Sequence, residues 1–299
     1  MKKTANNLLI ISILFLLSVS PIVSNTKDLS SSNIVETTQK KVSLPKELFD
    51  NTPLNPTKVY DNLYCFGTKS VVVWALKTSD GIILIDSMWD NKDAEVVVNG
   101  MKEVGLDPKD IKYVLVTHGH GDHYGGAKYF KDNFGSKILM SEVDTDLMLN
   151  SNEGANGSRS PKVKVDEFVK DLQQITLGDT VVTIIATPGH TPGGISLIFP
   201  VKQDGTTYMA GLWGGTAFPP ELKDKISYKN SINYFRKYTS LAKVTVELTA
   251  HLFSEDGYNK LEKAKNRKSG EKNPFDLGEK GFAEYLNNLE KSIDEAIKK

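Results

Sequence analysis

The stretch VTHGHGDHYGG at residues 116–126 concentrates side chains that bind metal ions. Its ligand-type residues fall within six positions and are His118, His120, Asp122 and His123. The whole chain contains only five histidines, and the other two are His190 and His251. Imidazole combined with carboxylate is a donor set that suits zinc, and also iron, copper or nickel. The stretch therefore predicts a metal centre.

Three predicted strands run directly into a histidine. They are VLVTH, which ends at His118, IIATPGH, which ends at His190, and ELTAH, which ends at His251. In layered α/β architectures, sites form where strands end and loops begin, so one shared edge would bring all five imidazoles into one cleft. His118 and His120 can then serve one metal. Asp122 and His123 can serve a second metal beside it, and each of the two remaining histidines would complete one of the two centres.

The rest of the chain alternates between strand-like and helix-like patterns. Apolar runs predict strands over 63–67, 70–76, 81–86, 111–117, 136–141, 179–187, 194–200, 206–211 and 243–251. Helical spacing predicts helices over 91–104, 123–134, 142–150, 229–241 and 280–299. Since no internal repeat or long linker divides the chain, we expect one domain over residues 51–299.

The N-terminal residues have a different composition. A basic start is followed by the apolar run at 8–19 and then by small residues, a pattern typical of a secretory signal peptide. The run is shorter than the roughly 20 apolar residues of a membrane span. We expect a signal peptide at 1–24, a flexible lead-in at 25–50 and no membrane span after cleavage. The protein would then be exported, either to a periplasm or as a secreted protein.

The overall composition narrows the partners. Lys plus Arg equals Asp plus Glu, so the formal net charge is zero and there is no overall field to attract nucleic acid. We expect a small-molecule partner and no nucleic acid, and no feature of the sequence indicates an oligomeric state. The single cysteine, Cys65, rules out an internal disulfide and lies in an apolar run, which indicates a small buried hydrophobe.

The histidine motifs carry a resemblance to a known family. THGHGDHYGG (117–126) resembles the HxHxDH signature of the metallo-β-lactamase fold superfamily, and TPGHTPGG (187–194) resembles its second histidine motif. The resemblance covers roughly residues 55–299 and implies an α/β fold, a four-layer αβ/βα sandwich with two Zn²⁺ per chain at one edge. By similarity, the first zinc would be bound by His118, His120 and His190. The second would be bound by Asp122, His123 and His251.

Within that superfamily, the pattern is similar to subclass B3 β-lactamases. Many other members carry an Asp that bridges both metals, but the matching stretch at 207–219 has neither this Asp nor the Cys of subclass B1. Residues 60–68 and 81–89, and the C-terminal segment with NPF at 273–275, also resemble B3 enzymes. One segment departs from the B3 pattern. B3 enzymes usually have a hydroxyl-rich segment where this chain has Gly211–Gly215, and only Thr216 supplies a hydroxyl there.

The resemblance implies a zinc hydrolase that opens a β-lactam or a related cyclic amide, an activity associated with antibiotic resistance. Metal-bound hydroxide, oriented by Asp122 as the catalytic residue, would attack the carbonyl. Loops around the expected cleft supply Trp213, Thr216 and Tyr124 as candidate substrate contacts, together with Trp89 and Phe218 as further aromatic candidates.

Two alternatives stay open at this point. The first is a zinc hydrolase of another ester or lactone in the same fold, which the missing hydroxyls of Gly211–Gly215 favour. The second is a metal-binding or sensing protein without catalysis, against which Asp122 argues because a storage site needs no carboxylate that orients water. An iron redox site is a further variant in this fold, but its usual extra carboxylates and flavin domain are not seen in this sequence.

Overall fold

The computed structural model describes residues 45–152 and 159–299. The predicted signal peptide at 1–24 and most of the predicted lead-in at 25–50 lie outside the described residues. The last part of that lead-in contains a short 3-10 helix, η1 (Lys46–Phe49). In the described part of the chain, no helix combines the length and apolarity that crossing a membrane requires.

The first sheet has seven strands in chain order. They are β1 (Thr57–Tyr60), β2 (Leu63–Gly67), β3 (Val72–Thr78), β4 (Gly81–Ile85), β5 (Ile111–Leu115), β6 (Lys137–Ser141) and β7 (Glu167–Val169). The first four strands pair antiparallel, whereas β4 to β7 pair parallel. The carboxyl ends of β4, β5 and β6 therefore lie at one edge of the sheet.

The second sheet has five strands in the order β12-β11-β10-β9-β8. Their bounds are β8 (Gln174–Leu177), β9 (Thr180–Ala186), β10 (Ile195–Gln203), β11 (Thr206–Leu212) and β12 (Val246–Leu248). Strand β10 is antiparallel to both β9 and β11, and β12 is parallel to β11. Consequently β9, β11 and β12 run in the same direction and end at the same edge.

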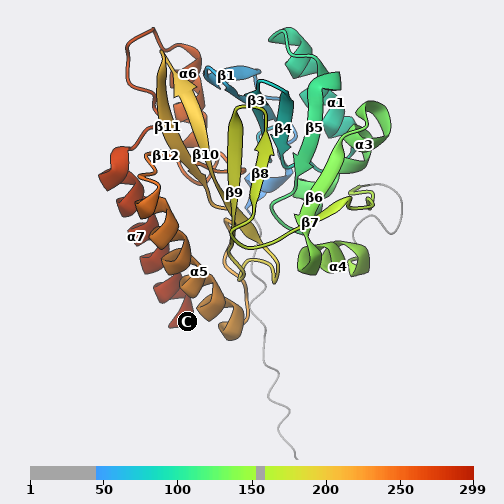
Figure 1. Cartoon of the computed structure of the whole chain (residues 1–299). Coiled ribbons are helices and arrows are strands. Elements are labelled where there is room, and N and C mark those ends of the chain that lie inside the picture. The colour runs from blue at the N-terminus through green and yellow to red at the C-terminus, as the bar shows by residue number, and fades with distance from the viewer. Residues whose placement is uncertain (1–44, 153–158) are drawn as a thin grey trace, which may run out of the picture. The chain divides into compact units, whose positions relative to one another are not determined.

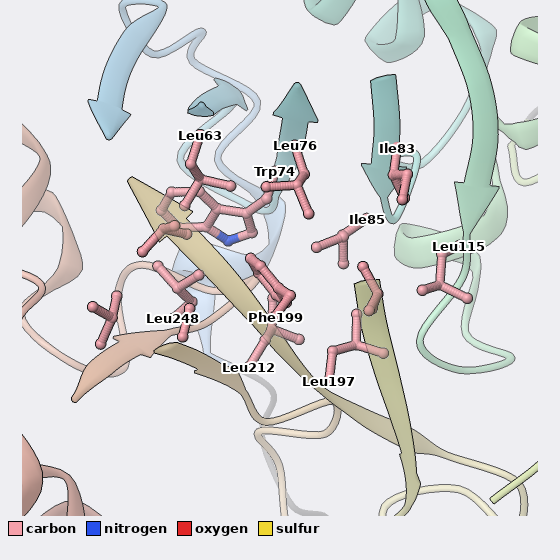
Figure 2. Packing of buried hydrophobic residues seen from close by; sticks show 14 of the residues in the cluster. Leu63, Trp74, Leu76, Ile83, Ile85, Leu115, Leu197, Phe199, Leu212 and Leu248 are labelled. Atoms are coloured by element: carbon pink, nitrogen blue, oxygen red, sulfur yellow. The ribbon is translucent and has the colours of Figure 1, made fainter. Parts of the chain in front are cut away.

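The core between the two sheets explains the continuous apolar runs in the sequence. In β3, Val72, Trp74 and Leu76 contribute to the cluster shared with the second sheet, whereas Val73 and Ala75 belong to the cluster on the opposite face. A strand buried on both faces needs apolar residues at every position, not only at alternate ones. Figure 2 shows side chains from both sheets meeting in this layer, among them Leu63, Trp74, Ile85, Leu197, Phe199 and Leu248.

Helices cover the outer face of each sheet (Figure 1). On the first sheet lie α1 (Asn91–Glu103) and α3 (Ala127–Phe134), on the second α5 (Leu222–Leu241) and α7 (Gly278–Ile297). Val97 of α1 and Phe130 of α3 are buried on the first sheet. Phe235 of α5 and Leu286 of α7 are buried on the second. The order helix, sheet, sheet, helix confirms the predicted four-layer αβ/βα sandwich.

The remaining helices are short. They are η2 (Pro108–Asp110), α2 (Gly121–Tyr124), α4 (Glu142–Asn150) and α6 (Gly257–Lys265). The helix predicted over 123–134 is interrupted, because α2 and α3 are separated by two glycines. A Cβ at the first of them, Gly125, would lie 1.8 Å from the carbonyl oxygen of Trp89, so the chain passes too close to that backbone for any other residue.

Candidate metal centre

The predicted metal ligands follow strands that end at the same edge of the two sheets. His118 comes three residues after the end of β5, and α2 then presents Asp122 and His123. His190 follows β9, and His251 follows β12. The prediction that three strand ends bring the five histidines together is thus confirmed, and the five imidazoles come from both sheets.

The first group of donors consists of His118, His120 and His190. One donor atom from each lies within 4.8 Å of the others. His190 Nε2 lies 3.0 Å from His120 Nδ1 and 3.2 Å from His118 Nε2. Nitrogen ligands about 2.0–2.1 Å from a tetrahedral zinc ion lie roughly 3.3 Å apart. The spacing of these three nitrogens therefore fits one zinc ion.

The second group consists of Asp122, His123 and His251, whose donor atoms also lie within 4.8 Å of one another. Asp122 Oδ2 lies 3.4 Å from the Nε2 atoms of both histidines. All three side chains are buried. The rings of His118 and His123 are 3.9 Å apart between centroids, so the two groups lie side by side. The arrangement fits two adjacent metal ions.

Hydrogen bonds at the far side of the ring orient three of the imidazoles. The Nδ1 atom of His190 lies 2.7 Å from the Ala217 carbonyl oxygen, and that of His251 lies 2.9 Å from the Ser70 carbonyl oxygen. A carbonyl can only accept, so Nδ1 carries the proton and Nε2 is left to bind metal. The Nδ1 atom of His118 similarly faces the Thr117 hydroxyl at 3.1 Å.

Asp86 supports the second group and was not predicted from the sequence. Its carboxylate lies 2.7 Å from His123 Nδ1 and accepts hydrogen bonds from the Thr117 backbone N–H and hydroxyl at 2.8 and 2.9 Å. The residue is fully buried at the end of β4 and has a left-handed backbone, with φ of 65°. Such a conformation is uncommon for a residue with a Cβ and recurs where a site constrains the chain.

Asp144, in α4, joins the two loops that carry the first group. Its Oδ2 accepts from the Gly119 N–H at 2.8 Å and from the Thr191 hydroxyl at 2.6 Å, and its Oδ1 accepts from the Gly193 N–H at 2.6 Å. Gly119 lies between two ligands, and Thr191 follows a third. The carboxylate is completely buried. It therefore fixes the position of one ligand loop relative to the other.

Charge and burial favour the metal-binding forms of four of the ligands, whereas at His123 the nearby Asp122 and Asp86 outweigh burial and raise the pKa to about 10. Burial, together with neighbouring imidazoles, lowers the pKa of His118 and lowers that of His190 to about 3. Burial also lowers the pKa of His251. These rings are consequently neutral at pH 7, the state that binds a metal ion. Burial by itself would raise the pKa of Asp122, but the adjacent His123 and His251 outweigh it and hold the carboxyl ionised.

The loop after β11 replaces the hydroxyl-rich B3 segment with a tightly packed glycine pair. Trp213 Nε1 and the Tyr228 hydroxyl both donate to the Gly215 carbonyl, at 2.6 and 2.7 Å. A Cβ at Gly215 would lie 2.4 Å from His190 Cβ, and one at Gly214 would lie 1.8 Å from the Ile195 carbonyl oxygen. This loop therefore tolerates no side chain at either glycine, hydroxyl-bearing or otherwise.

The candidate substrate contacts occupy different environments. Tyr124 is 0% exposed and packs between the first sheet and its helices, so the structure contradicts a substrate contact for it. Trp213 is 3% exposed and packs on Tyr228, but its ring also lines a cavity together with the half-buried Thr216. For these two residues the substrate contact stays a prediction. Cys65 is buried, as predicted, and burial raises the pKa of its thiol.

Comparison with known proteins gives a family match over part of the chain. Residues 64–204 match the family model of the metallo-beta-lactamase superfamily. Glyoxylase B2 of Dictyostelium discoideum is 30% identical over 140 residues, 44% of this chain and 43% of that protein. An N-acyl homoserine lactonase of Bacillus sp is 28% identical over 109 residues, 36% of this chain and 41% of that protein. The matches thus span less than half the length of these curated relatives.

A solved structure extends the likeness to nearly the whole described chain. BJP-1, a subclass B3 metallo-beta-lactamase of Bradyrhizobium japonicum, superposes with a TM-score of 0.71 at 27% sequence identity. The superposition covers 84% of this chain and 96% of that one. The fold is therefore B3-like, as the sequence motifs indicated.

Proposed function

We propose that this chain, whose residues 64–204 match the metallo-beta-lactamase superfamily, is a hydrolase that uses two zinc ions per chain. The observation that carries the proposal is the pair of adjacent donor groups, His118–His120–His190 and Asp122–His123–His251. Two groups whose nearest rings are 3.9 Å apart can act on one substrate together.

The side chains of the protein set the orientation and the charge of the donor atoms at this centre. When bound, zinc ions supply Lewis-acid polarisation of a carbonyl and lower the pKa of water to about 7. Asp122 is the ionised carboxylate of the site: Oδ2 lies in the second donor group, and Oδ1 can accept a hydrogen bond that orients water. His118, His190 and His251 stay neutral because they are buried, which leaves Nε2 of each ring free as a donor to metal. No serine or cysteine nucleophile is required.

The proposed substrate is a β-lactam or a related cyclic amide. The B3-like fold and the absence of both a bridging Asp and a Cys in residues 207–219 support this choice. A second candidate is an ester or lactone. The observation that favours it is the Gly214–Gly215 turn, because no hydroxyl projects from the place where B3 enzymes usually have one. The likeness to an N-acyl homoserine lactonase agrees with this alternative.

The test is hydrolysis by the zinc-loaded protein of four compounds: a chromogenic cephalosporin, a carbapenem, an N-acyl homoserine lactone and an aryl ester. His120→Ala, which removes one donor of the first group, is the control. Zinc content is measured by mass spectrometry for both proteins. Turnover of the first two compounds that is lost in the control supports the β-lactamase function. Turnover of only the lactone or ester moves the function to the second candidate, and two bound zinc ions with no turnover of any compound would refute the hydrolase.

We also propose export, on the basis of the signal-like pattern at residues 1–24. N-terminal sequencing of protein recovered from the medium or periplasm tests it. A mature chain that begins after residue 24 or close to it supports export. A full-length chain found only inside the cell would contradict it.

A further inference from the structure

A cavity of about 560 Å³ lies between α6, α7, β12 and the loop after β11. None of the six proposed metal ligands lines it. Its wall nevertheless adjoins both donor groups. Thr249 and Ser254 line the cavity and hydrogen bond to the backbone of His251 at 3.1 and 2.7 Å. Thr216 lines it and precedes Ala217, whose carbonyl binds His190. The cavity is thus a neighbour of the metal centre.

Carboxylates dominate the polar lining of this cavity. Glu247, Glu255 and Glu284 line it, and Lys260 is the basic side chain among the lining residues. Lys260 Nζ lies 2.6 Å from Glu247 Oε2, so one carboxylate is neutralised. Lys260 is also near Glu255, so three carboxylates in the lining share one cation. A cavity with this balance attracts cations and repels anions.

The buried side chain of Glu247 also indicates a binding site in this cavity. It is 1% exposed, and its Oε1 has no hydrogen-bond partner among the residues that the structure describes. Its neighbours Val246 and Leu248 face the core between the sheets, so in the alternation of β12 the Glu247 side chain faces α7 and the cavity. An unpaired buried carboxylate oxygen is costly unless a donor reaches it. Burial, followed by the nearby Glu247, raises the pKa of Glu255 to about 7, which indicates a site short of positive charge.

The arrangement favours an organic cation over a metal ion. In residues 45–152 and 159–299, three His, Cys, Asp or Glu donors converge within 4.8 Å only in the two groups already described. The cavity carboxylates therefore do not share one metal ion. Instead, the aromatic residues Trp213, Phe218 and Tyr285 line the same space. Aromatic faces beside carboxylates are the surroundings that recognise an ammonium group.

We propose that this cavity binds a protonated amine carried by a small molecule. The further step, that this small molecule is a substrate of the neighbouring metal centre, rests on the proposed function. The volume lies within the range of small-molecule pockets, roughly 300–1,000 Å³. The amine would donate to Glu247 Oε1 and Glu255, with its apolar part against the aromatic rings.

Binding of benzylammonium tests the proposal without any need for hydrolysis. Its affinity is measured by ligand-observed NMR titration against that of benzyl alcohol, which has a similar shape and no charge. Glu255→Gln is the main variant, because this half-buried side chain makes no hydrogen bond in the described structure and glutamine has nearly the same size. Glu95→Gln, an exposed position on α1, is the matched control. Glu284→Gln, on the exposed face of α7, is the second variant should the first fail to fold.

We expect benzylammonium to bind and benzyl alcohol to bind about tenfold more weakly or not at all. Glu255→Gln should weaken benzylammonium binding about tenfold, the equivalent of about 1.4 kcal/mol, and Glu95→Gln should not change it. Equal binding of the two compounds, or equal binding by all variants, would overturn the proposal. The same titration on His120→Ala separates the two proposals. Unchanged binding there, with no turnover of any substrate by the wild type, keeps the amine site and discards only its link to hydrolysis.

Discussion

Asp144→Asn tests whether one buried carboxylate holds the first donor group together. The carboxylate accepts three hydrogen bonds, from the Gly119 N–H, the Thr191 hydroxyl and the Gly193 N–H, at 2.8, 2.6 and 2.6 Å. Asparagine keeps the shape but has one acceptor oxygen. If that oxygen keeps the first two bonds, the amide NH₂ faces the Gly193 N–H, donor against donor. The substitution therefore leaves one buried N–H unpaired and pushes the two loops apart.

The magnitude follows from this loss. A hydrogen bond to a charged group contributes about 1.5–3 kcal/mol, and a buried unpaired N–H costs about 1–3 kcal/mol. Part of this is offset, because burial raises the pKa of Asp144 and its charge is itself costly. We expect the free energy of unfolding to fall by about 2 kcal/mol. Loss of a partner that orients metal ligands typically weakens metal binding about 10–100-fold. The first group should show this loss, and the second group should not, because all three partners lie in the loops of the first.

Zinc affinity is measured by competition with a chromophoric chelator, which resolves two binding steps. Unfolding in urea gives the stability of the same samples. Asp146→Asn is the matched control, since it lies two positions further along α4 and is exposed. Equal weakening of both zinc sites, or no weakening beyond that of the control, would refute the positioning role of Asp144.

Three further substitutions test other parts of the structure. Gly215→Ala would place a Cβ 2.4 Å from His190 Cβ. We expect the zinc affinity of the first group to fall more than about tenfold while the circular dichroism spectrum stays native. Unchanged zinc affinity would contradict the packing. Burial raises the pKa of Glu255 from 4.5 to about 7, so its protonation stabilises the fold fully below pH 4.5, and this contribution is lost as the pH rises through about 7. Glu255→Gln should therefore raise the melting temperature by about 2–4 °C at pH 8 and not at pH 4.5, and equal shifts at both would refute it. Trp74→Ala empties the centre of the core, where the ring is 0% exposed and its Nε1 donates to the Thr249 carbonyl at 2.9 Å. It should lower the free energy of unfolding by about 3–5 kcal/mol in urea titration, and a loss below about 1 kcal/mol would contradict the packing.

The members of the two donor groups could be predicted because their chemistry is rare in the chain. With only five histidines, each one at or near a strand end carries information about the site. The four-layer fold followed from the resemblance, and the continuous apolar runs agree with it because β3 is buried on both faces. The prediction for Tyr124 was wrong because the sequence shows a ring beside a histidine but not the direction in which it points. On the short helix α2, His123 faces the metal centre while the next residue faces the core.

Asp144 could not be separated from its neighbours in the sequence. Residues 142–150 read EVDTDLMLN, and from the sequence any of the three acidic residues could lie on an exposed helix surface. Only the tertiary structure shows that the middle one is buried against a loop nearly fifty positions away, where Gly193 lies. The same holds for Asp86, although a carboxylate at the end of the buried strand GIILI was a usable signal. In a parallel sheet that position faces the edge where sites form.

The acceptors that set the imidazole tautomers leave no signal in the sequence at all. The Nδ1 atoms of His190 and His251 face the carbonyl oxygens of Ala217 and Ser70, and every residue type has a carbonyl. The second of these contacts spans 181 positions and joins the loop after β12 to the turn before β3. Both carbonyls lie in connections outside the strands, where no sheet partner occupies them, so they can accept from a side chain. The edge that gathers the ligands thus also supplies the acceptors that orient them. For this reason the residues of the two donor groups could be predicted from the sequence, whereas the atoms that they would present to a metal ion required the structure.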